Sequence, residues 1–453
     1  MTPSSSPSRS PRVLVVAYYV PPAGGPAVQR ILQFLEFLGE EGWTPEVLTV
    51  RKGAYPNRDP SLLDVLPPDL RVHRTRALDP YAIYQAVTGK GEEDLPAGSM
   101  DEGTSWAESL AKWVRANVFL PDARVGWWPF AVYRGTQLLR SGRFDAVITT
   151  GAPHSVHLIG SALHRWVGTP WVADLHDPWT DISYYDDLPH TRWARRIDAA
   201  LERHVLSSAS AVTTVSPSWA DLFAGKAEND YHVVENGFSA AEFEAVEGHS
   251  PEDEFVLAHV GKLYASRNPT ALWAALAQLR DEGAIPDLTV RLIGTVAPPV
   301  ERSIREHGLD PIVERVDFVP HEEALRQMAR STLLLLVIEP FAQADGMITS
   351  KLYEYLASER PVLGVGPPDG DASGLLRRHD AGRMVGGDDV AGAAECVRRH
   401  YEAWADGAPR SGARRADLSE HTRRHQARRM ARVLQSVTEP RPAPRGRPQP
   451  RNR

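Results

Sequence analysis

A lysine and a glutamate in the second half of the chain have a spacing that suits a phosphorylated sugar or nucleoside. Lys351 and Glu354 lie three positions apart in a segment of helical periodicity, so they share one face of the expected helix. A cation in the first turn and a carboxylate one turn later would bind a phosphate followed by a hydroxylated ring. The alternative is an exposed salt bridge worth roughly 0.2–0.5 kcal/mol.

Further cations accompany this pair. Only six of the 51 basic residues are lysines, and two of them, Lys262 and Lys351, fall in loops that join a strand to a helix. Together with Arg267 they would place positive charge at neighbouring strand ends, where it could bind a diphosphate and stabilise it as a leaving group. The sequence has neither a Walker loop nor the Gly-x-Gly-x-x-Gly fingerprint, which argues against ATP hydrolysis and against nicotinamide or flavin cofactors.

The elements around Lys351 predict a parallel crossover unit. The apolar run Leu333–Ile338 reads as a buried strand, and a loop with Gly346 follows it. Ser350 is expected to cap a helix over 351–358, and a second buried strand is expected at Val362–Val365. In such sheets ligands bind beyond the carboxyl ends of the strands, with anions at helix N-termini.

The first half of the chain repeats this organisation. A strand at Arg12–Tyr19 leads into Gly24 and Gly25, which let the backbone approach a ligand at the mouth of a helix over 28–38. Further strands are expected at 46–50, 144–149, 171–175, 212–215, 232–234, 255–260, 288–293 and 315–319, and further helices at 270–282, from about 391 and from 419.

Two of these strands end in candidate site residues, His176 as a catalytic residue and His154 and Asp177 on the acceptor side. His154 follows the strand at 144–149, and His176 with Asp177 follows the strand at 171–175. Either histidine could instead be a core residue bonded to a backbone carbonyl. No cluster of His, Cys or Asp has metal-ligand spacing, so we expect neither a metal nor a cofactor.

Length and composition are those of a two-domain globular protein. The chain has 453 residues, 42% hydrophobic and 24% charged, and its single cysteine, Cys396, fits a reducing compartment. No apolar run reaches the roughly 20 residues that span a bilayer. We expect a disordered leader (1–11), a first domain (12–240), a linker (241–254), a second domain (255–400), C-terminal helices (401–438) and a disordered basic tail (439–453).

The net charge of -7 is unevenly distributed. From Arg398 onward fifteen Arg face five acidic residues, which gives +10 and leaves -17 for the remainder. This basic segment could contact anionic lipid, although a solvated helix and tail is the favoured interpretation, and nucleic acid is not expected as a partner.

Aromatic residues cluster between positions 106 and 133, interspersed with arginines. Trp106, Leu110, Trp113 and Val114 share one helical face, which could bind a membrane surface or an acceptor. Burial in the core is the favoured interpretation. Before this stretch, the Gly-rich and acidic segment 89–103 is expected to be a mobile surface insertion.

Taken together, these motifs resemble the family 4 glycosyltransferases (group 1), over roughly residues 12 to 400. The resemblance depends on the order and spacing of Tyr18–Gly25, Asp174–Trp179, Val215–Ser218, Asn236–Phe238, Gly261–Leu263, Arg267–Pro269 and Ser350–Leu356. It implies an α/β fold of two Rossmann-like doubly wound domains that face each other across a cleft, the B-type glycosyltransferase fold.

The resemblance also implies an activity and roles for individual residues. The activity is metal-independent transfer of a sugar, of hexosyltransferase type, from a nucleotide diphosphate donor with retention at the anomeric carbon. Lys262 and Arg267 correspond to the basic pair on the donor phosphates, and Glu354 to the carboxylate on the ribose. His176 corresponds to a histidine beside the donor sugar. The loop at Gly24 and Gly25 lies where the donor phosphates and the acceptor meet.

One position departs from the family pattern. The first glutamate of the family's Glu-seven residues-Glu motif should stand at 346, where this chain has Gly346. Asp345 and the backbone amides of Met347 and Ile348 are the candidates to hold the sugar hydroxyls in its place. Gly261 and Lys351 complete the expected donor-binding set.

The sequence therefore predicts a cytoplasmic glycosyltransferase that builds a surface polysaccharide or glycolipid and acts on a glycan or lipid-linked acceptor. Peripheral contact with the inner face of an anionic membrane is a further hypothesis. Two alternatives remain: a catalytically silent glycosyltransferase-like subunit that binds partners, and a nucleotide-sugar epimerase of the same fold.

Overall fold

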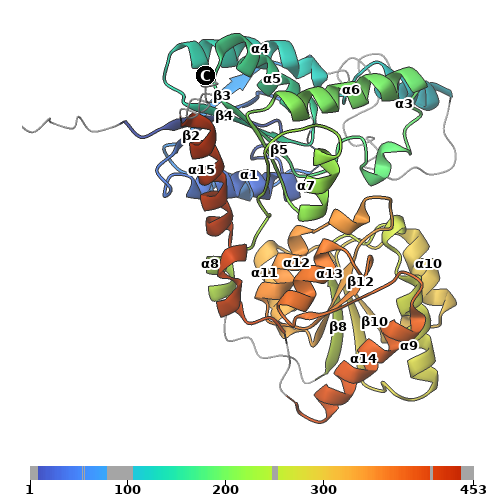
Figure 1. Ribbon diagram of the computed structural model, residues 1–453. Coiled ribbons are helices and arrows are strands. Elements are labelled where there is room, and N and C mark those ends of the chain that lie inside the picture. The colour runs from blue at the N-terminus through green and yellow to red at the C-terminus, as the bar shows by residue number, and fades with distance from the viewer. Residues whose placement is uncertain are drawn as a thin grey trace, which may run out of the picture.

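The chain forms two α/β domains, each built on a parallel sheet (Figure 1). The computed structural model describes residues 9–53, 55, 57–78, 106–246, 254–408 and 412–439. Most of the predicted leader, the predicted insertion at 89–103 and the predicted tail after Glu439 lie outside these residues. The two sheets have seven and six strands, which confirms the predicted fold class of two doubly wound domains.

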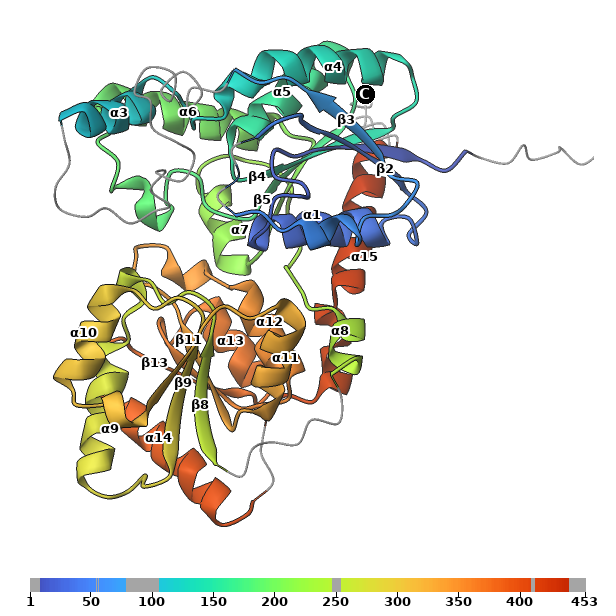
Figure 2. The same cartoon turned by 180° about the vertical axis from the view of Figure 1, so that it is seen from behind.

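The first sheet has the order β3-β2-β1-β4-β5-β6-β7. Its strands are β1 (Arg12–Val16), β2 (Thr44–Val50), β3 (Arg71–Thr75), β4 (Ala146–Gly151), β5 (Trp171–Leu175), β6 (Ala211–Thr214) and β7 (Tyr231–Val233). One face is covered by α4 (Trp128–Arg140), α5 (Ser155–Val167), α6 (Arg192–Ser208) and α7 (Pro217–Ala224), and the other by α1 (Pro26–Phe37) and α15 (Arg423–Thr438). Helix α3 (Trp106–Asn117) lies at the edge of this domain (Figure 2).

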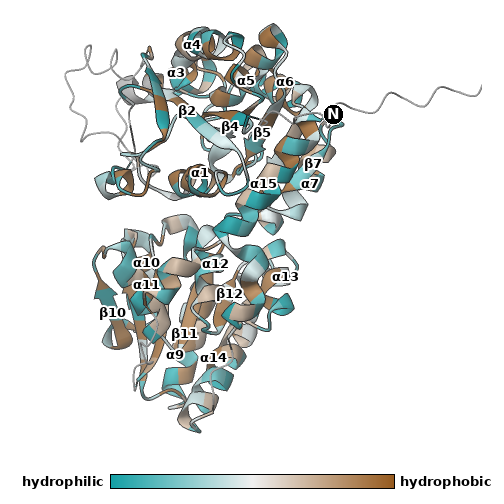
Figure 3. Cartoon of the chain, turned by 90° about the vertical axis from the view of Figure 1, so that its left-hand side faces the viewer, coloured by the Kyte–Doolittle hydropathy of each residue, from teal (hydrophilic) through white to brown (hydrophobic). Residues whose placement is uncertain are grey.

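The second sheet has the order β10-β9-β8-β11-β12-β13. Its strands are β8 (Phe255–Val260), β9 (Leu288–Ile293), β10 (Val313–Val316), β11 (Leu333–Val337), β12 (Val362–Val365) and β13 (Gly382–Val385). One face carries α11 (His321–Arg330), α12 (Ser350–Ala357) and α13 (Asp371–Arg378), and the other α9 (Thr270–Asp281), α10 (Pro298–Glu306) and α14 (Val390–Ala405). In Figure 3 strand β11 is hydrophobic throughout, as expected for a strand buried on both faces.

The strand predictions succeed in the sheet interiors and at two edge strands, β7 and β10, whose predicted bounds are shifted by one to three residues. The predicted strands at 171–175, 255–260, 288–293 and 362–365 have the observed bounds. Strands β3 and β13 were not predicted. Both are edge strands; β3 has no fully buried residue and β13 buries only Met384 and Val385, so they lack the apolar runs that mark the central strands.

One helix start was wrong by a residue. Ser350 is the first residue of α12, and Thr349, whose backbone is extended, precedes it as the N-cap. The prediction that Ser350 caps the helix is therefore wrong. The Thr349 side chain accepts no hydrogen bond from the first backbone amides of α12 either. The Thr349 hydroxyl is buried and has no hydrogen-bond partner among the described residues. The N-terminus of α12 therefore keeps its capacity to bind an anion.

The chain passes between the domains twice. After β7 it crosses to the second domain through Phe238 and the short helix α8 (Ala240–Glu244), which begins just before the linker predicted at 241–254. It returns through a 3-10 helix, η8 (Arg415–His421), into α15, which packs against α1 and the first core (Figure 2). The two crossings are joined by hydrogen bonds from the Phe238 amide to the His421 carbonyl (3.0 Å) and from the Arg423 amide to the Phe238 carbonyl (2.8 Å).

The aromatic stretch after residue 106 is divided between core and surface. Trp127 is fully buried and its indole N–H donates to the Thr75 hydroxyl. Trp113 and Tyr133 are 45% and 68% exposed, and Leu110 is exposed as well. The favoured core interpretation is therefore correct for Trp127 and wrong for the outer face of α3.

Candidate donor and acceptor site

The predicted site residues fall at the points where each doubly wound sheet reverses its strand order. In the first sheet β1 and β4 are neighbours, and the connections that follow them leave in opposite directions. Gly24 and Gly25 follow β1, and His154 follows β4. In the second sheet β8 and β11 are likewise neighbours from which the chain leaves in opposite directions. Gly261 follows β8, and the loop that enters α12 follows β11. Ligands of such sheets bind at this switch point.

The glycine loop after β1 is held against a neighbouring segment. The Gly24 amide donates to the Asn57 carbonyl at 3.1 Å, and a Cβ at Gly24 would lie 3.1 Å from Cβ of Asp59. Gly25 has φ +106 and directly precedes α1, a conformation that favours glycine. Because Gly24 and Gly25 have no side chains, a ligand can approach the backbone closely at the start of α1.

His176 and His154 lie together beyond β4 and β5. The Ala152 amide donates to Nε2 of His176 at 3.1 Å, so Nδ1 carries the hydrogen in the neutral ring. This Nδ1 is buried and has no partner among the described residues. Burial lowers the pKa of His176, although Asp177, whose carboxylate is 3.7 Å from Nε2, opposes that shift. The site thus holds a neutral imidazole with an unused N–H donor.

The ring of His154 is fixed by stacking. It lies parallel to the indole of Trp179, with centroids 4.8 Å apart and an interplanar angle of 8°. The Trp179 N–H donates to Asp198 Oδ1 at 2.7 Å, which anchors the indole. Both His154 nitrogens are buried without a partner among the described residues, and burial, with the charges of neighbouring histidines, lowers its pKa.

Beneath these histidines lies a buried ion pair. Arg30 of α1 donates from Nε and Nη2 to the two oxygens of Asp174, at 2.9 and 2.6 Å. The hydroxyls of Thr150 and Thr213 also donate to this carboxylate, at 2.8 and 2.6 Å. Burial opposes ionisation of Asp174, but the Arg30 guanidinium and these hydrogen bonds hold its pKa below the ordinary value. The pair ties α1 to the end of β5, next to His176.

In the second domain, a lysine and an arginine converge on the glycine after β8. Gly261 has φ +111, a conformation that favours glycine, and a Cβ there would lie 2.6 Å from Nζ of Lys351, so the end of the lysine side chain would have to move. Burial, followed by the charge of Arg267, lowers the pKa of Lys351 to about 8. Two cations that repel each other in a partly desolvated place are suited to bind an anion.

Arg267 and Lys262 differ in their surroundings. Arg267 Nε donates to Glu339 at 3.3 Å, and its guanidinium lies 5.6 Å from the Tyr264 ring centroid. Lys262 is exposed beside the buried Leu263. Glu339, which follows β11, was not identified from the sequence, because nothing in its local pattern reveals that it orients Arg267.

Glu354 is largely but not fully buried on α12, near an unexpected histidine. Burial raises its pKa, and Nε2 of His321 is 3.9 Å from its carboxylate. His321 also bonds to Glu242 at 3.4 Å, which raises the pKa of the histidine. A largely buried carboxylate with few strong partners can accept hydrogen bonds from ligand hydroxyls. His321 was missed because it lies at the start of α11, in a segment with no motif.

The departure at Gly346 has a structural explanation in Trp219 of the first domain. A Cβ at Gly346 would lie 2.5 Å from Nε1 of Trp219 and closer still to the indole carbon beside it. This indole is 3% exposed and its N–H donates to the Gln343 carbonyl at 3.0 Å. The volume that a glutamate would need at 346 is therefore filled by a tryptophan that the sequence analysis did not single out.

The neighbours of Gly346 have separate environments. Asp345 is exposed, Ile348 is buried, and Met347 packs against hydrophobic residues of both domains. The Ser218 amide at the start of α7 also donates to Asp371 at 2.9 Å. These contacts bring the carboxyl edges of the two sheets together.

A possible metal-ligand grouping lies outside this site. Among the described residues, His379, Glu420 and His421 place their ligand atoms within 4.8 Å of one another, at the crossings between the domains. None of the residues expected to bind donor or acceptor belongs to this grouping.

Comparisons with known proteins agree with this geometry. Residues 24–237 match the family model described as a glycosyl transferase 4-like domain. No curated protein matches the chain. Among solved structures, a glycosyltransferase from Rickettsia africae ESF-5 is similar at 12% identity, covering 94% of this chain and 98% of that one with a TM-score of 0.60.

Two further structures share the fold. WaaG, a glycosyltransferase involved in lipopolysaccharide biosynthesis, is 14% identical, with coverage of 93% and 99% and a TM-score of 0.53. A variant of S. aureus TarM in complex with Fondaparinux, alpha-GlcNAc-glycerol and UDP is 7% identical, with coverage of 94% and 99% and a TM-score of 0.58. At these identities the likeness concerns the fold. No helix in the described part of the chain is long and apolar enough to cross a membrane.

Proposed function

Because residues 24–237 match a glycosyl transferase 4-like domain, we propose that the chain is a family 4 glycosyltransferase that transfers a sugar from a nucleotide diphosphate donor to a glycan or lipid-linked acceptor. The product would be a surface polysaccharide or glycolipid. Two similar structures are consistent with this class: one protein acts in lipopolysaccharide biosynthesis, and the other was solved with UDP.

The observation that carries the proposal is the pair of cations at Gly261. Lys351 lies against this glycine, and Arg267 is close enough to lower the pKa of the lysine. The donor diphosphate would bind there and relieve the repulsion, with the N-terminus of α12 and Lys262 adding positive charge. The same groups would stabilise the diphosphate as it leaves, without requiring a metal ion.

The remaining residues suit the other parts of a donor and acceptor. Glu354 would accept hydrogen bonds from the ribose hydroxyls, and the Asp345 carboxylate with the amides of Met347 and Ile348 would hold the sugar. The unpartnered Nδ1–H of His176 would donate to the donor sugar near the reacting carbon. His154 and Asp177 would lie on the acceptor side. Transfer with retention at the anomeric carbon is part of the proposal.

The test is ligand-induced stabilisation of the purified protein by a panel of nucleotide diphosphates and nucleotide sugars. A ligand that binds only the folded state raises the unfolding midpoint. We expect at least one compound to do so, and the double variant Lys262→Ala/Arg267→Ala to lose the shift. The matched control is Arg302→Ala/Arg305→Ala, which removes two exposed cations of α10 in the same domain. No shift at millimolar concentration with any compound would overturn the proposal.

We further propose that the outer faces of α3 and α6 contact an anionic membrane. Asn117 joins the two elements, because its side chain donates to the Pro189 carbonyl at 2.9 Å and accepts from the Thr191 amide at 2.7 Å. Trp113 and Trp193 are 45% and 73% exposed. Exposed tryptophans beside the arginines of α6 suit the headgroup region.

This membrane proposal has its own test. The wild-type chain should co-sediment with phosphatidylglycerol vesicles at low salt, and Trp113→Ala/Trp193→Ala should bind at least several-fold less. Because Trp193 is a surface residue, its replacement should leave the thermal unfolding midpoint unchanged. Weaker vesicle binding by a variant with the wild-type midpoint would then show that the tryptophans contact the membrane. Equal binding by the variant would remove α3 and α6 as the contact.

A further inference from the structure

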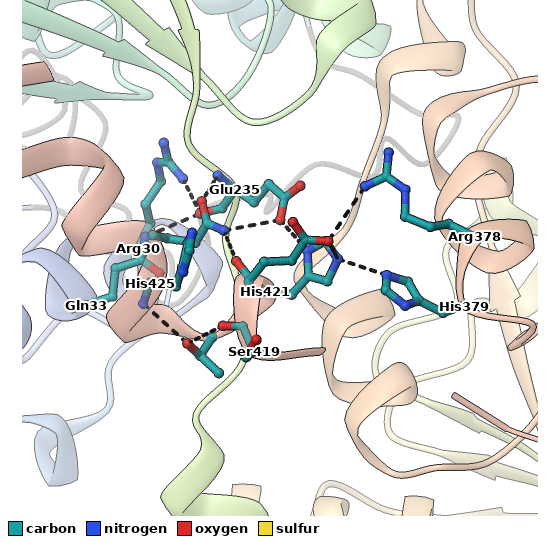
Figure 4. Close-up of polar contacts among 11 residues, drawn as sticks. Arg30, Gln33, Glu235, Arg378, His379, Ser419, His421 and His425 are labelled. Atoms are coloured by element: carbon teal, nitrogen blue, oxygen red, sulfur yellow. Dashed lines mark hydrogen bonds and ion pairs between the residues drawn. The ribbon is translucent and has the colours of Figure 1, made fainter. Parts of the chain in front are cut away.

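The two crossings between the domains meet at a cluster of histidine and glutamate side chains away from the donor site (Figure 4). Glu235 follows β7 on the first crossing, and Glu420 with His421 ends η8 on the second. His379 comes from the end of α13 in the second domain. This cluster is not visible in the sequence, because His379 and His421 are 42 positions apart.

The ligand atoms of three of these residues are close together. Nε2 of His379 is 3.0 Å from Nε2 of His421, and Oε1 of Glu420 is 3.6 Å from the same nitrogen. All three atoms lie within 4.8 Å of one another. Two nitrogens that bind one tetrahedral Zn²⁺ at about 2.0–2.1 Å stand roughly 3.3 Å apart. Small side-chain rotations would therefore place the three atoms around one ion.

A buried carboxylate prepares His421 for this role. Nδ1 of His421 donates to Oε2 of Glu235 at 2.6 Å, so the lone pair of Nε2 points toward His379. Glu235 is itself fixed, because Gln426 donates to its carboxylate at 3.3 Å and accepts from its amide at 2.8 Å. A carboxylate behind a histidine is the arrangement that orients metal-binding imidazoles.

We propose that His379, Glu420 and His421 bind one divalent transition-metal ion, best matched by Zn²⁺, at the crossings between the two domains. Two imidazoles with one carboxylate suit Zn²⁺, whereas Mg²⁺ and Ca²⁺ prefer oxygen ligands. The Glu420 side chain is about half exposed, so water can complete a fourth position. Without an ion, His379 donates its Nε2–H to His421, and Arg378 lies 3.9 Å from Glu420, so the ion must replace both contacts.

The position of the site gives it a structural consequence. His379 belongs to the second domain, whereas His421 is bonded to Glu235, whose carbonyl accepts from Arg30 of the first domain at 3.2 Å. A bound ion would thus link α13 to both crossings. It would restrict the relative movement of the domains independently of the donor and acceptor.

The experiment is titration of the full-length chain, without an affinity tag and after treatment with EDTA, with ZnCl₂ by calorimetry and with CoCl₂ by visible spectroscopy. We expect one Zn²⁺ per chain and the absorption of tetrahedral Co²⁺. The variant His379→Gln should weaken Zn²⁺ binding at least tenfold and remove the Co²⁺ absorption, and Glu235→Gln should weaken binding by roughly 10–100-fold.

The matched control is His425→Gln, which also removes one of the sixteen histidines and lies beside the same crossing. It should bind Zn²⁺ as the wild type does. His379 is only half-buried, so its variant should keep the wild-type circular dichroism and metal-free midpoint. Absence of binding to the wild-type chain would overturn the proposal, as would equal Zn²⁺ affinity in the wild type and His379→Gln.

Discussion

Replacing Gly346 with alanine should destabilise the contact between the two domains. The added Cβ would lie 2.5 Å from Nε1 of Trp219, nearer than real Cβ contacts come. The indole cannot move aside without losing its bond to the Gln343 carbonyl and its burial. The backbone does not itself require glycine here, since the φ of Gly346 is not positive. Any cost must therefore come from the indole.

The magnitude follows from overpacking. Inserting a methyl group into a well-packed site costs about 1–3 kcal/mol. For a domain of 150–250 residues, each kcal/mol lowers Tm by about 2–4 °C, so the variant should unfold roughly 2–12 °C lower. Replacing Trp219 with alanine removes the clash but leaves a cavity that costs about 3–5 kcal/mol.

The assay is a double-mutant cycle by calorimetry and urea unfolding. In the Trp219→Ala background, Gly346→Ala should cost close to nothing, which gives a coupling energy of about 1–3 kcal/mol between the two positions. The control is Gly374→Ala, where an added Cβ meets no atom within 4 Å and α13 should become slightly more stable. An equal cost of Gly346→Ala with and without the tryptophan would refute the reasoning, as would no cost at all.

Four further outcomes are expected from the site. Affinity for a nucleoside diphosphate should be full below pH 8 and fall as pH rises through 8, because Lys351, with its pKa lowered to about 8, then loses its proton; the same pH titration of Lys351→Arg should be flatter. Glu354→Gln should raise the donor KM about tenfold with little change in kcat, because an amide has one acceptor oxygen where the carboxylate has two; steady-state kinetics will show whether kcat falls instead. Asp345→Asn should lower kcat/KM at least tenfold, and an unchanged value would remove Asp345 from the sugar site. Asp174→Asn should cost about 3–5 kcal/mol in urea unfolding, because it leaves Arg30 buried and unpaired; a cost below about 1 kcal/mol would mean that the pair does not hold α1.

The sequence alone determined the fold class and the position of the loops that carry chemistry. Strands such as Leu333–Val337 are buried on both faces, so an unbroken apolar run marks them without tertiary information. The residues that end them, Gly261 and His176 among others, could be selected because ligands of doubly wound sheets bind at carboxyl strand ends. Their roles in donor and acceptor binding stay predictions until the variants are measured.

Only the tertiary structure showed which residues of distant segments contact these loops. The glycine at 346 makes sense only beside Trp219, which comes from the other domain and lies 127 positions earlier (346 - 219). Similarly, His321 meets Glu354, and His379 meets His421, only because separate helices pack together. Contacts of this kind cannot be recognised in the sequence, because the residue pattern around each partner reflects only the helix or strand in which that partner lies. The edge strands β3 and β13 escaped prediction for a related reason: each has one neighbouring strand rather than two, and few of its residues are buried.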